Sequence, residues 1–238
     1  MAFKSGQASR LYLGDFNFTP VTAQAGGDVS VDMLDTSTLN DTAKQFIPGL
    51  DTSTFKLSGW LDTLATADLH MDQINDLKTA TATEPLTWCP LGSALGDPCE
   101  MAGVWEAAYS TGSTVADKVS FSLDAQTDGA TDIGFILHDN TAVTGTGNGT
   151  GVDRTVTSAT SAVAHLHVTA FSGFTSVAIV VADSADNISF ATIGTFTSVT
   201  ALTSQRLAIS GTVRRYVRYA ATVTGTGSIT FVVAFAAR

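Results

Sequence analysis

Charged side chains, cysteines and long apolar runs are all scarce in this sequence. Asp, Glu, Lys and Arg make up 14% of its 238 residues, against roughly 25% in typical soluble domains. Thr, Ser, Ala and Gly dominate instead, which favours strands and tight turns over long amphipathic helices. No apolar run approaches the roughly 18 residues of a membrane span, and the opening MAFKSGQASR lacks the apolar core of a secretory signal. We therefore expect a soluble chain, made in a cytoplasm, that has no membrane partner.

The two cysteines, Cys89 and Cys99, are too few for a disulfide framework. Their spacing is also not that of a zinc ribbon or a redox pair. In a reducing compartment they stay as two thiols, whereas under oxidising conditions a bridge could close the segment between them. The geometry of the fold decides between these alternatives.

Residues that could carry chemistry are few. His165 and His167 lie two apart, and hence on one face of a strand, but a zinc site needs a third ligand that the sequence does not offer. The acidic segment 183–187 lacks the spacing of a calcium loop and favours a turn. GTGNGTG at 145–151 lacks the Lys and the helix of a phosphate-binding loop, and no Gly-x-Ser-x-Gly elbow occurs. We predict no enzymatic activity, no metal and no cofactor.

Charge divides unevenly along the chain. Residues 1–128 carry 6 Lys and Arg against 17 Asp and Glu, a net charge of −11, and residues 129–238 carry 6 Arg against 5 Asp, a net charge of +1. Near this point an alternating strand pattern also gives way to a stretch rich in Gly and Thr. We therefore predict two domains, 1–128 and 129–238. The acidic first domain would repel a nucleic-acid backbone, which disfavours a role that grips phosphates.

The first domain is predicted to be α+β, a β-sandwich or barrel with one packed helix. The helix spans 63–77, where apolar residues recur at helical spacing. A single helical turn is expected at 41–46, capped by Asn40 or Asp41. Strands are predicted from alternation and from β-branched or aromatic content at residues 9–16, 29–34, 54–61, 85–89, 99–109 and 115–125.

The second domain carries no helical pattern. Its β-branched runs are separated by Gly, Asn or Ser turns, which is typical of an antiparallel sandwich. The whole chain is therefore predicted to be mainly β. The predicted strands of this domain are residues 152–156, 163–171, 177–182, 191–196, 205–223 and 228–236.

One segment of the first domain is distinctive. RLYLGDFNF at 10–18 is followed by DTSTLNDTAKQFIPGL at 35–50 and then by FKLSGW at 55–60. This series resembles the major tail protein, or tail tube protein, of long-tailed bacteriophages, in which a strand leads to a similar DTAK-FIPGL element and then to a strand ending in Gly and an aromatic. SADN at 184–187 and the segment 211–238 are similar to the C-terminal sandwich of many of these proteins.

The resemblance implies a structural virion protein that is made in the bacterial cytoplasm and ends up in the tail. Its subunits would form hexameric rings, and the rings would stack into a tube through which DNA passes without sticking. Further partners would be other tail proteins and head–tail connector proteins. Residues 1–128 would then be the assembly domain, and residues 129–238 an outward-facing decoration.

Candidate contacts between subunits lie on the loop 41–50. DTAKQFIPGL presents apolar residues on a loop too short to bury them, although they could instead fill the core under the helix. The candidate lumen residues are Asp62 and Asp68, whose charge would repel DNA phosphates. The candidate contact residues are Asp41, Lys44, Phe46, Ile47 and Leu50.

Arg214, Arg215 and Arg218 form a basic cluster in the second domain. They alternate along a predicted strand, so that both of its faces carry Arg. Three Arg in a domain of net charge +1 would release few counterions from DNA. We expect a solvated or interface-pairing strand rather than a nucleic-acid patch.

Other classes of function stay open. A carbohydrate-binding sandwich displayed on the surface could stack sugars on Phe174, Tyr216 or Tyr219. A head-decoration protein would share the β-rich composition but would not predict the DTAKQFIPGL element. An enzyme such as a depolymerase would need paired acids in a groove, and the second domain has only 5 Asp.

Overall fold

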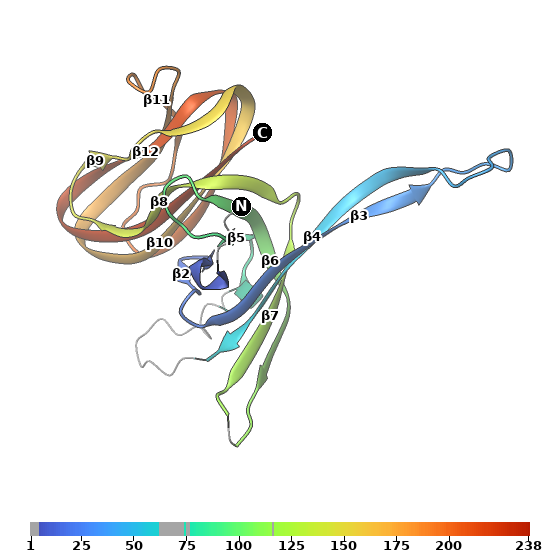
Figure 1. Ribbon diagram of the computed structural model, residues 1–238. Helices are drawn as coiled ribbons and strands as arrows, with labels where there is room; N and C mark the ends of the chain where they lie inside the picture. The colour runs from blue at the N-terminus through green and yellow to red at the C-terminus, as the bar shows by residue number, and fades with distance from the viewer. Residues whose placement is uncertain (1–4, 62–73, 75–76, 116) are drawn as a thin grey trace. The chain divides into compact units, whose positions relative to one another are not determined.

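A computed structural model describes residues 5–61, 74, 77–115 and 117–238 (Figure 1). Strands dominate that part of the chain, so the prediction of a mainly β fold is confirmed. The only helical residues in it are the 3-10 turn η1 (Gly6–Ala8), residue 74 and residues 77–79. The chain forms two compact units: unit 1 comprises Met1–Pro20, Thr81–Gly103 and Asp132–Arg238, and unit 2 comprises Val21–Ala80 and Val104–Thr131.

Unit 1 is built around two long strands, β10 (Val152–Ser184) and β12 (Thr203–Ala237). They pair antiparallel along most of their length. Leu166 of β10 pairs with Val233 on one side and with Gln205 on the other, so β12 flanks this part of β10 twice. Such long strands can enclose a core only if they bend and pass from one layer to the next.

Glycines provide these bends. Gly173 of β10 has a φ of 81° and Gly225 of β12 has a φ of 93°, a region that other residues rarely adopt. Phe174 pairs with Gly225, so both strands bend at the same level. Space is short there as well, because a Cβ on Gly173 would lie 2.7 Å from the carbonyl oxygen of Thr226.

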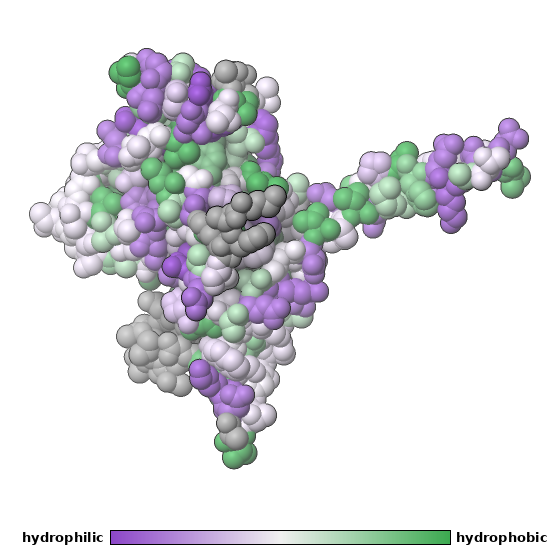
Figure 2. All heavy atoms as spheres, viewed as in Figure 1, coloured by the Kyte–Doolittle hydropathy of each residue, from purple (hydrophilic) through white to green (hydrophobic). Residues whose placement is uncertain are grey.

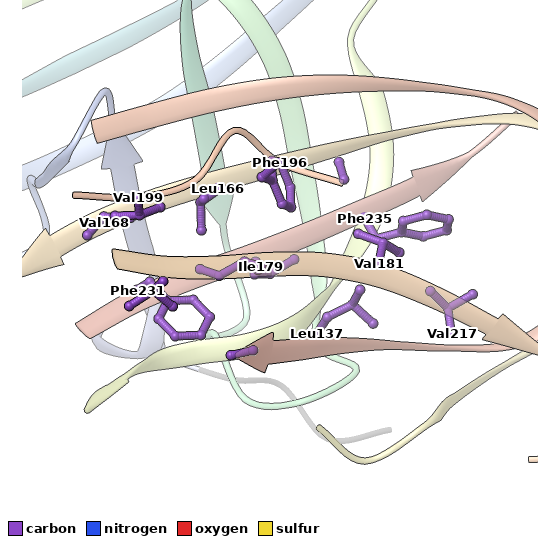
Figure 3. Packing of buried hydrophobic residues seen from close by; sticks show 14 of the residues in the cluster. Leu137, Leu166, Val168, Ile179, Val181, Phe196, Val199, Val217, Phe231 and Phe235 are labelled. Carbon is purple, nitrogen blue, oxygen red and sulfur yellow. The ribbon is translucent and has the colours of Figure 1, made fainter. Parts of the chain in front are cut away.

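Aliphatic and aromatic side chains fill the core of unit 1 (Figure 3). Leu166, Ile179, Phe231 and Phe235 are each 0% exposed, and burying one such side chain stabilises the fold by roughly 1.5–3 kcal/mol. The other strands of unit 1 are β1 (Arg10–Leu13), β2 (Phe16–Asn17), β5 (Glu84–Cys89), the start of β6 (Pro98–Gly112), β8 (Asp132–Val143), β9 (Gly147–Asn148) and β11 (Ala191–Thr195).

A second, smaller core lies on the other face of β10. Because successive side chains of a strand point to opposite faces, Val163 leaves the main core and joins residues of β1, β5, β6, β8 and β12. Both faces of β10 are therefore buried at this point. The second core consists of Tyr12, Cys89, Cys99, Met101, Ile136, Val163, Val232, Ala234 and Ala236.

Unit 2 contains an antiparallel sheet in the order β3 (Thr22–Asp35), β4 (Phe46–Trp60), β7 (Ser120–Thr127) and the rest of β6. Alternate residues of the middle strands are buried, among them Phe55, Leu57 and Leu123. The residues between them, such as Lys56, are exposed. This alternation is the pattern by which the strands were predicted.

The helical turn predicted at 41–46 is wrong. Residues 41–45 lie in the loop between β3 and β4, where side chains take the backbone hydrogen bonds that a helix would use. The carboxylate of Asp41 accepts from the backbone N–H of Thr38 at 2.7 Å, and the hydroxyl of Ser37 accepts from the N–H of Gln45 at 2.8 Å. The helix predicted over 63–77 falls mostly outside the described residues.

Strand β8 was not predicted. Asp132, Gly134 and Asn140 interrupt its apolar residues and mimic a loop. Gly134 is nonetheless required, because a Cβ there would lie 2.4 Å from the carbonyl oxygen of Phe235 on the paired strand β12.

The predicted boundary at 128–129 lies close to the point where the chain last enters unit 1. Two earlier segments, Met1–Pro20 and Thr81–Gly103, also belong to unit 1. The roles given to the two predicted domains, assembly and outward decoration, stay predictions.

Candidate functional site

The candidate assembly surface of unit 2 is a β-ribbon, residues 28–53. β3 and β4 pair along their whole length, from Thr22 with Gly59 to Asp35 with Phe46. β7 joins β4 only from Thr54 onward. Among the described strands, the ribbon therefore has no third neighbour (Figure 1). A two-stranded ribbon of this kind is marginally stable in water on its own.

Both faces of the ribbon carry exposed apolar side chains, and green patches run along it in Figure 2. The register and the alternation of side chains assign the residues to faces. Leu50, at 81% exposure, and Met33, at 57%, lie on opposite faces. One face carries Val29, Val31, Met33 and Phe46, and the other carries Leu34, Ile47 and Leu50.

Polar interactions close the loop of the ribbon. The carboxylate of Asp41 accepts hydrogen bonds from the backbone N–H and the hydroxyl of Thr38, and these bonds lower the pKa of Asp41. Lys44 lies 3.7 Å from the carboxylate of Asp35 and 6.0 Å from the ring centroid of Phe46. These contacts give the loop a defined shape while its apolar neighbours stay exposed.

The structure brings all five predicted contact residues together on this ribbon. Phe46 and Ile47 are 47% and 51% exposed, so the alternative that they fill a core beneath a helix is wrong for the single chain. Their role between subunits stays a prediction. The predicted lumen residues, Asp62 and Asp68, lie outside the described residues.

Sequence reasoning missed the contribution of β3 to this surface. The strand at 29–34 was predicted, but none of its residues was named as a candidate contact. The overlooked signal is the pair Met33 and Leu34, adjacent apolar residues that must point to opposite faces of a strand. A ribbon with apolar residues on both faces and no covering layer is expected to bind something else.

Two of the three arginines of the basic cluster are neutralised within unit 1. Arg214 and Arg215 donate to the carboxylates of Asp183 and Asp153, at 2.6 Å and 2.8 Å. The guanidinium of Arg218 lies 3.9 Å from the ring centroid of Phe190. The Nε of Arg218 is buried without a hydrogen-bond partner. Since two of the three guanidinium groups are already paired with carboxylates of the same chain, the cluster makes a poor phosphate-binding patch.

His165 and His167 form a buried polar chain with Thr87. The carbonyl oxygen of Gly14 lies 2.7 Å from His167 Nδ1, so that nitrogen carries a proton and Nε2 accepts from the Thr87 hydroxyl, at 2.7 Å. The Thr87 oxygen is then free to accept from His165 Nδ1, at 3.1 Å. Both rings are therefore neutral.

Burial lowers the pKa of both histidines, to about 4 for His167 and well below the usual range for His165. Repulsion from His167 when that ring is protonated, and from Arg206, lowers the pKa of His165 further. His165 Nε2 is buried without a hydrogen-bond partner. No cluster of three or more His, Cys, Asp or Glu suited to a metal occurs in the described part of the chain. The three side chains link β5 and β10 of unit 1.

No helix formed by the described residues is both long and apolar enough to cross a membrane.

No protein-family model matches this sequence, and no curated protein matches it either. Several solved structures are similar in fold. The SPP1 tail tube covers 55% of this chain and 78% of its own, at 10% identity and a TM-score of 0.44. A chain of the virion of a native gene transfer agent covers 55% and 98%, at 9% identity and a TM-score of 0.43. The SPP1 Dit protein, a hub of the phage adsorption apparatus, covers 94% and 98%, at 11% identity and a TM-score of 0.41.

Proposed function

We propose that this chain is a structural subunit of a bacteriophage tail tube, which forms hexameric rings that stack around a channel for DNA. The observation that carries the proposal is the ribbon of unit 2. It bears the DTAKQFIPGL element of the resemblance, and it exposes apolar residues on both faces. The protein is not an enzyme under this proposal, and it needs no cofactor.

The ribbon needs a partner for energetic reasons. Leu50 and Ile47 on one face and Met33 on the other are about half exposed or more, and each apolar Å² removed from water contributes roughly 25 cal/mol. The outer edge of β3 has no strand paired to it among the described strands. An exposed edge of this length is an aggregation hazard in a monomer but a binding surface in an assembly.

Charge indicates what the partner surface is like. Residues 28–53 carry five Asp and one Lys, a net charge of −4. Two ribbons facing each other would repel, which disfavours a symmetric ribbon-to-ribbon dimer. The ribbon therefore binds a different surface of the next copy. Such head-to-tail contacts close into rings or continue as filaments, the two outcomes that a tube of stacked rings uses.

Other tail proteins and head–tail connector proteins are the further partners of this proposal, and DNA is only cargo. The carbohydrate-binding alternative has less support, because its aromatic residues are engaged in packing. Phe174 is 6% exposed, the ring of Tyr219 packs edge-on against Phe231, and Arg215 lies over the ring of Tyr216.

The test is electron microscopy of the purified chain at rising concentration and rising salt, which screens the repulsion between acidic surfaces. Rings or hollow tubes with sixfold symmetry are the expected result. A chain that stays monomeric under every condition, and also fails to join rings when mixed with tail extract, would overturn the proposal. A glycan-array screen of the same sample tests the alternative.

A further inference from the structure

Cys89 and Cys99 lie side by side inside unit 1. Cys89 ends β5 and Cys99 is the second residue of β6, and these two strands are neighbours in the sheet. Their exposures are 0% and 2%, and both belong to the second core of unit 1. Side chains from adjacent strands that enter the same core lie on the same face of the sheet.

The two thiols are in contact. The side chain of Cys89, together with burial, raises the pKa of Cys99 well above its usual value. Both side chains are thiols in the structure, with no bond between the sulfurs. A disulfide needs Cβ atoms about 3.5–4.5 Å apart. Two side chains that enter the same core from neighbouring strands therefore need only a small shift to form that bond.

The intervening loop holds this arrangement. The N–H of Gly92 donates to the carbonyl of Cys89 at 3.3 Å, and the N–H of Asp97 donates to the carbonyl of Ala94 at 2.9 Å. The carboxylate of Asp97 accepts from the N–H of Ala94 at 3.2 Å. Backbone bonds thus order the loop at both ends, so a bridge would join positions that the fold already keeps together.

We propose that Cys89 and Cys99 form an intrachain disulfide when the chain meets a small disulfide oxidant such as oxidised glutathione. One cysteine thiolate attacks the oxidant, forms a mixed disulfide and releases one molecule of reduced glutathione. The second cysteine, after losing its proton to solvent, attacks the protein sulfur of that mixed disulfide and releases the other. Two thiol protons and two electrons leave the protein, and the oxidant is reduced to two thiols.

Burial decides when the reaction occurs. The oxidant cannot reach either sulfur in the folded state, and the raised pKa of Cys99 leaves little thiolate to react. Oxidation of the folded chain should therefore be slow and limited by local opening. A chain that is refolded in the presence of the oxidant should form the bridge readily, because its thiols are accessible until the core closes.

The experiment refolds the chain in glutathione buffer, either reduced or oxidised, and then alkylates it in denaturant. We expect two alkylated cysteines in the reduced sample, and in the oxidised sample none, with a mass lower by two hydrogen atoms. Asp97 is the only acidic residue between the cysteines. Cleavage at Asp97 should separate the peptide that carries Cys89 from the peptide that carries Cys99 in the reduced chain and leave these two peptides joined in the oxidised chain.

Single variants, Cys89→Ser and Cys99→Ser, serve as controls. The oxidised wild-type chain should melt several degrees higher than the reduced chain, because the bridge restricts the unfolded state. Either variant should melt at one temperature in both buffers. Two alkylatable thiols after refolding in oxidant, or disulfide-linked dimers in place of the intrachain link, would overturn the proposal. Neither outcome depends on whether the chain assembles into a tube.

Discussion

Arg214 holds Asp183 by four hydrogen bonds across two strands of unit 1. The backbone N–H of Arg214 donates to Asp183 Oδ2 at 2.7 Å, and its Nε and Nη2 donate to Oδ1 at 2.9 Å and 2.6 Å. Nη2 also donates to the backbone carbonyl of Asp183 at 3.1 Å. The Asp183 side chain is 1% exposed, whereas Arg214 keeps 38% of its side chain in solvent.

Asp183→Ala should therefore destabilise the chain strongly. The change leaves a backbone N–H and part of a guanidinium without an acceptor, at a cost of about 2 kcal/mol. Urea unfolding followed by circular dichroism measures the loss. Asp153→Ala is the matched control, because Asp153 makes a similar pair with Arg215 at the surface and surface pairs contribute little. If both variants lost the same stability, burial of Asp183 would not make its pair with Arg214 stronger than the surface pair of Asp153 and Arg215.

The buried histidines predict a loss of stability in mild acid. The pKa of His167 is about 4 in the folded chain and 6.5 in the unfolded chain. Between these values the unfolded chain binds a proton that the folded chain does not, so the free energy of unfolding falls as the pH falls. The loss from His167 is about 3 kcal/mol once the pH reaches 4, and His165 adds to it.

Urea unfolding at several pH values between 7 and 4 measures this loss. The His167→Gln variant should show a shallower dependence on pH over the same window. Asp153 and Asp186, whose pKa values are lowered to about 2, contribute stability that is lost only below their unfolded value of 3.8. If the free energy of unfolding of the wild-type chain did not change between pH 6.5 and 4.5, the two histidines would not be buried and neutral in the folded chain.

Leu50→Asp should abolish self-assembly without unfolding the chain. The side chain is 81% exposed, so an aspartate is tolerated in the monomer to within about 0.5 kcal/mol, but it places a charge in the apolar contact. Ile188→Asp is the control, since Ile188 is also 81% exposed and lies in unit 1. Sedimentation and electron microscopy compare the variants. If the Leu50→Asp variant still formed tubes, the ribbon would not be the contact between subunits.

Local patterns predicted most of the strands but not where they end or what they pair with. Val119, Phe121 and Leu123 alternate with polar residues, and the last two are buried in β7 as expected. The ribbon was not predictable in the same way, because whether a third strand pairs beside two others depends on residues that are distant in the sequence. Pro48 lies within β4, in the part of that strand that has β3 as its one partner among the described strands, and a strand edge tolerates proline.

The long strands of unit 1 show a second limit of sequence reasoning. The prediction divided β10 and β12 at their Gly and Ser residues, which usually mark turns. In the structure Gly173 and Gly225 bend strands that continue beyond them. Whether a glycine ends a strand or bends it depends on the partner that runs alongside. The partner here is distant in the chain, as Phe174 with Gly225 illustrates.

Gly173→Ala should be more harmful than either of two other Gly→Ala changes. Gly173 combines a φ of 81° with a Cβ position 2.7 Å from a backbone oxygen, so the variant should lose at least about 2 kcal/mol. Gly211 has a φ of 101° but open space around it, and should lose about 1 kcal/mol from backbone strain alone. Gly145 has neither constraint, so Gly145→Ala should change the stability little.

Thermal and urea unfolding rank the three variants. If Gly173→Ala were as stable as Gly145→Ala, the two long strands would not need glycine to bend, and the enclosure of the core of unit 1 would require another cause.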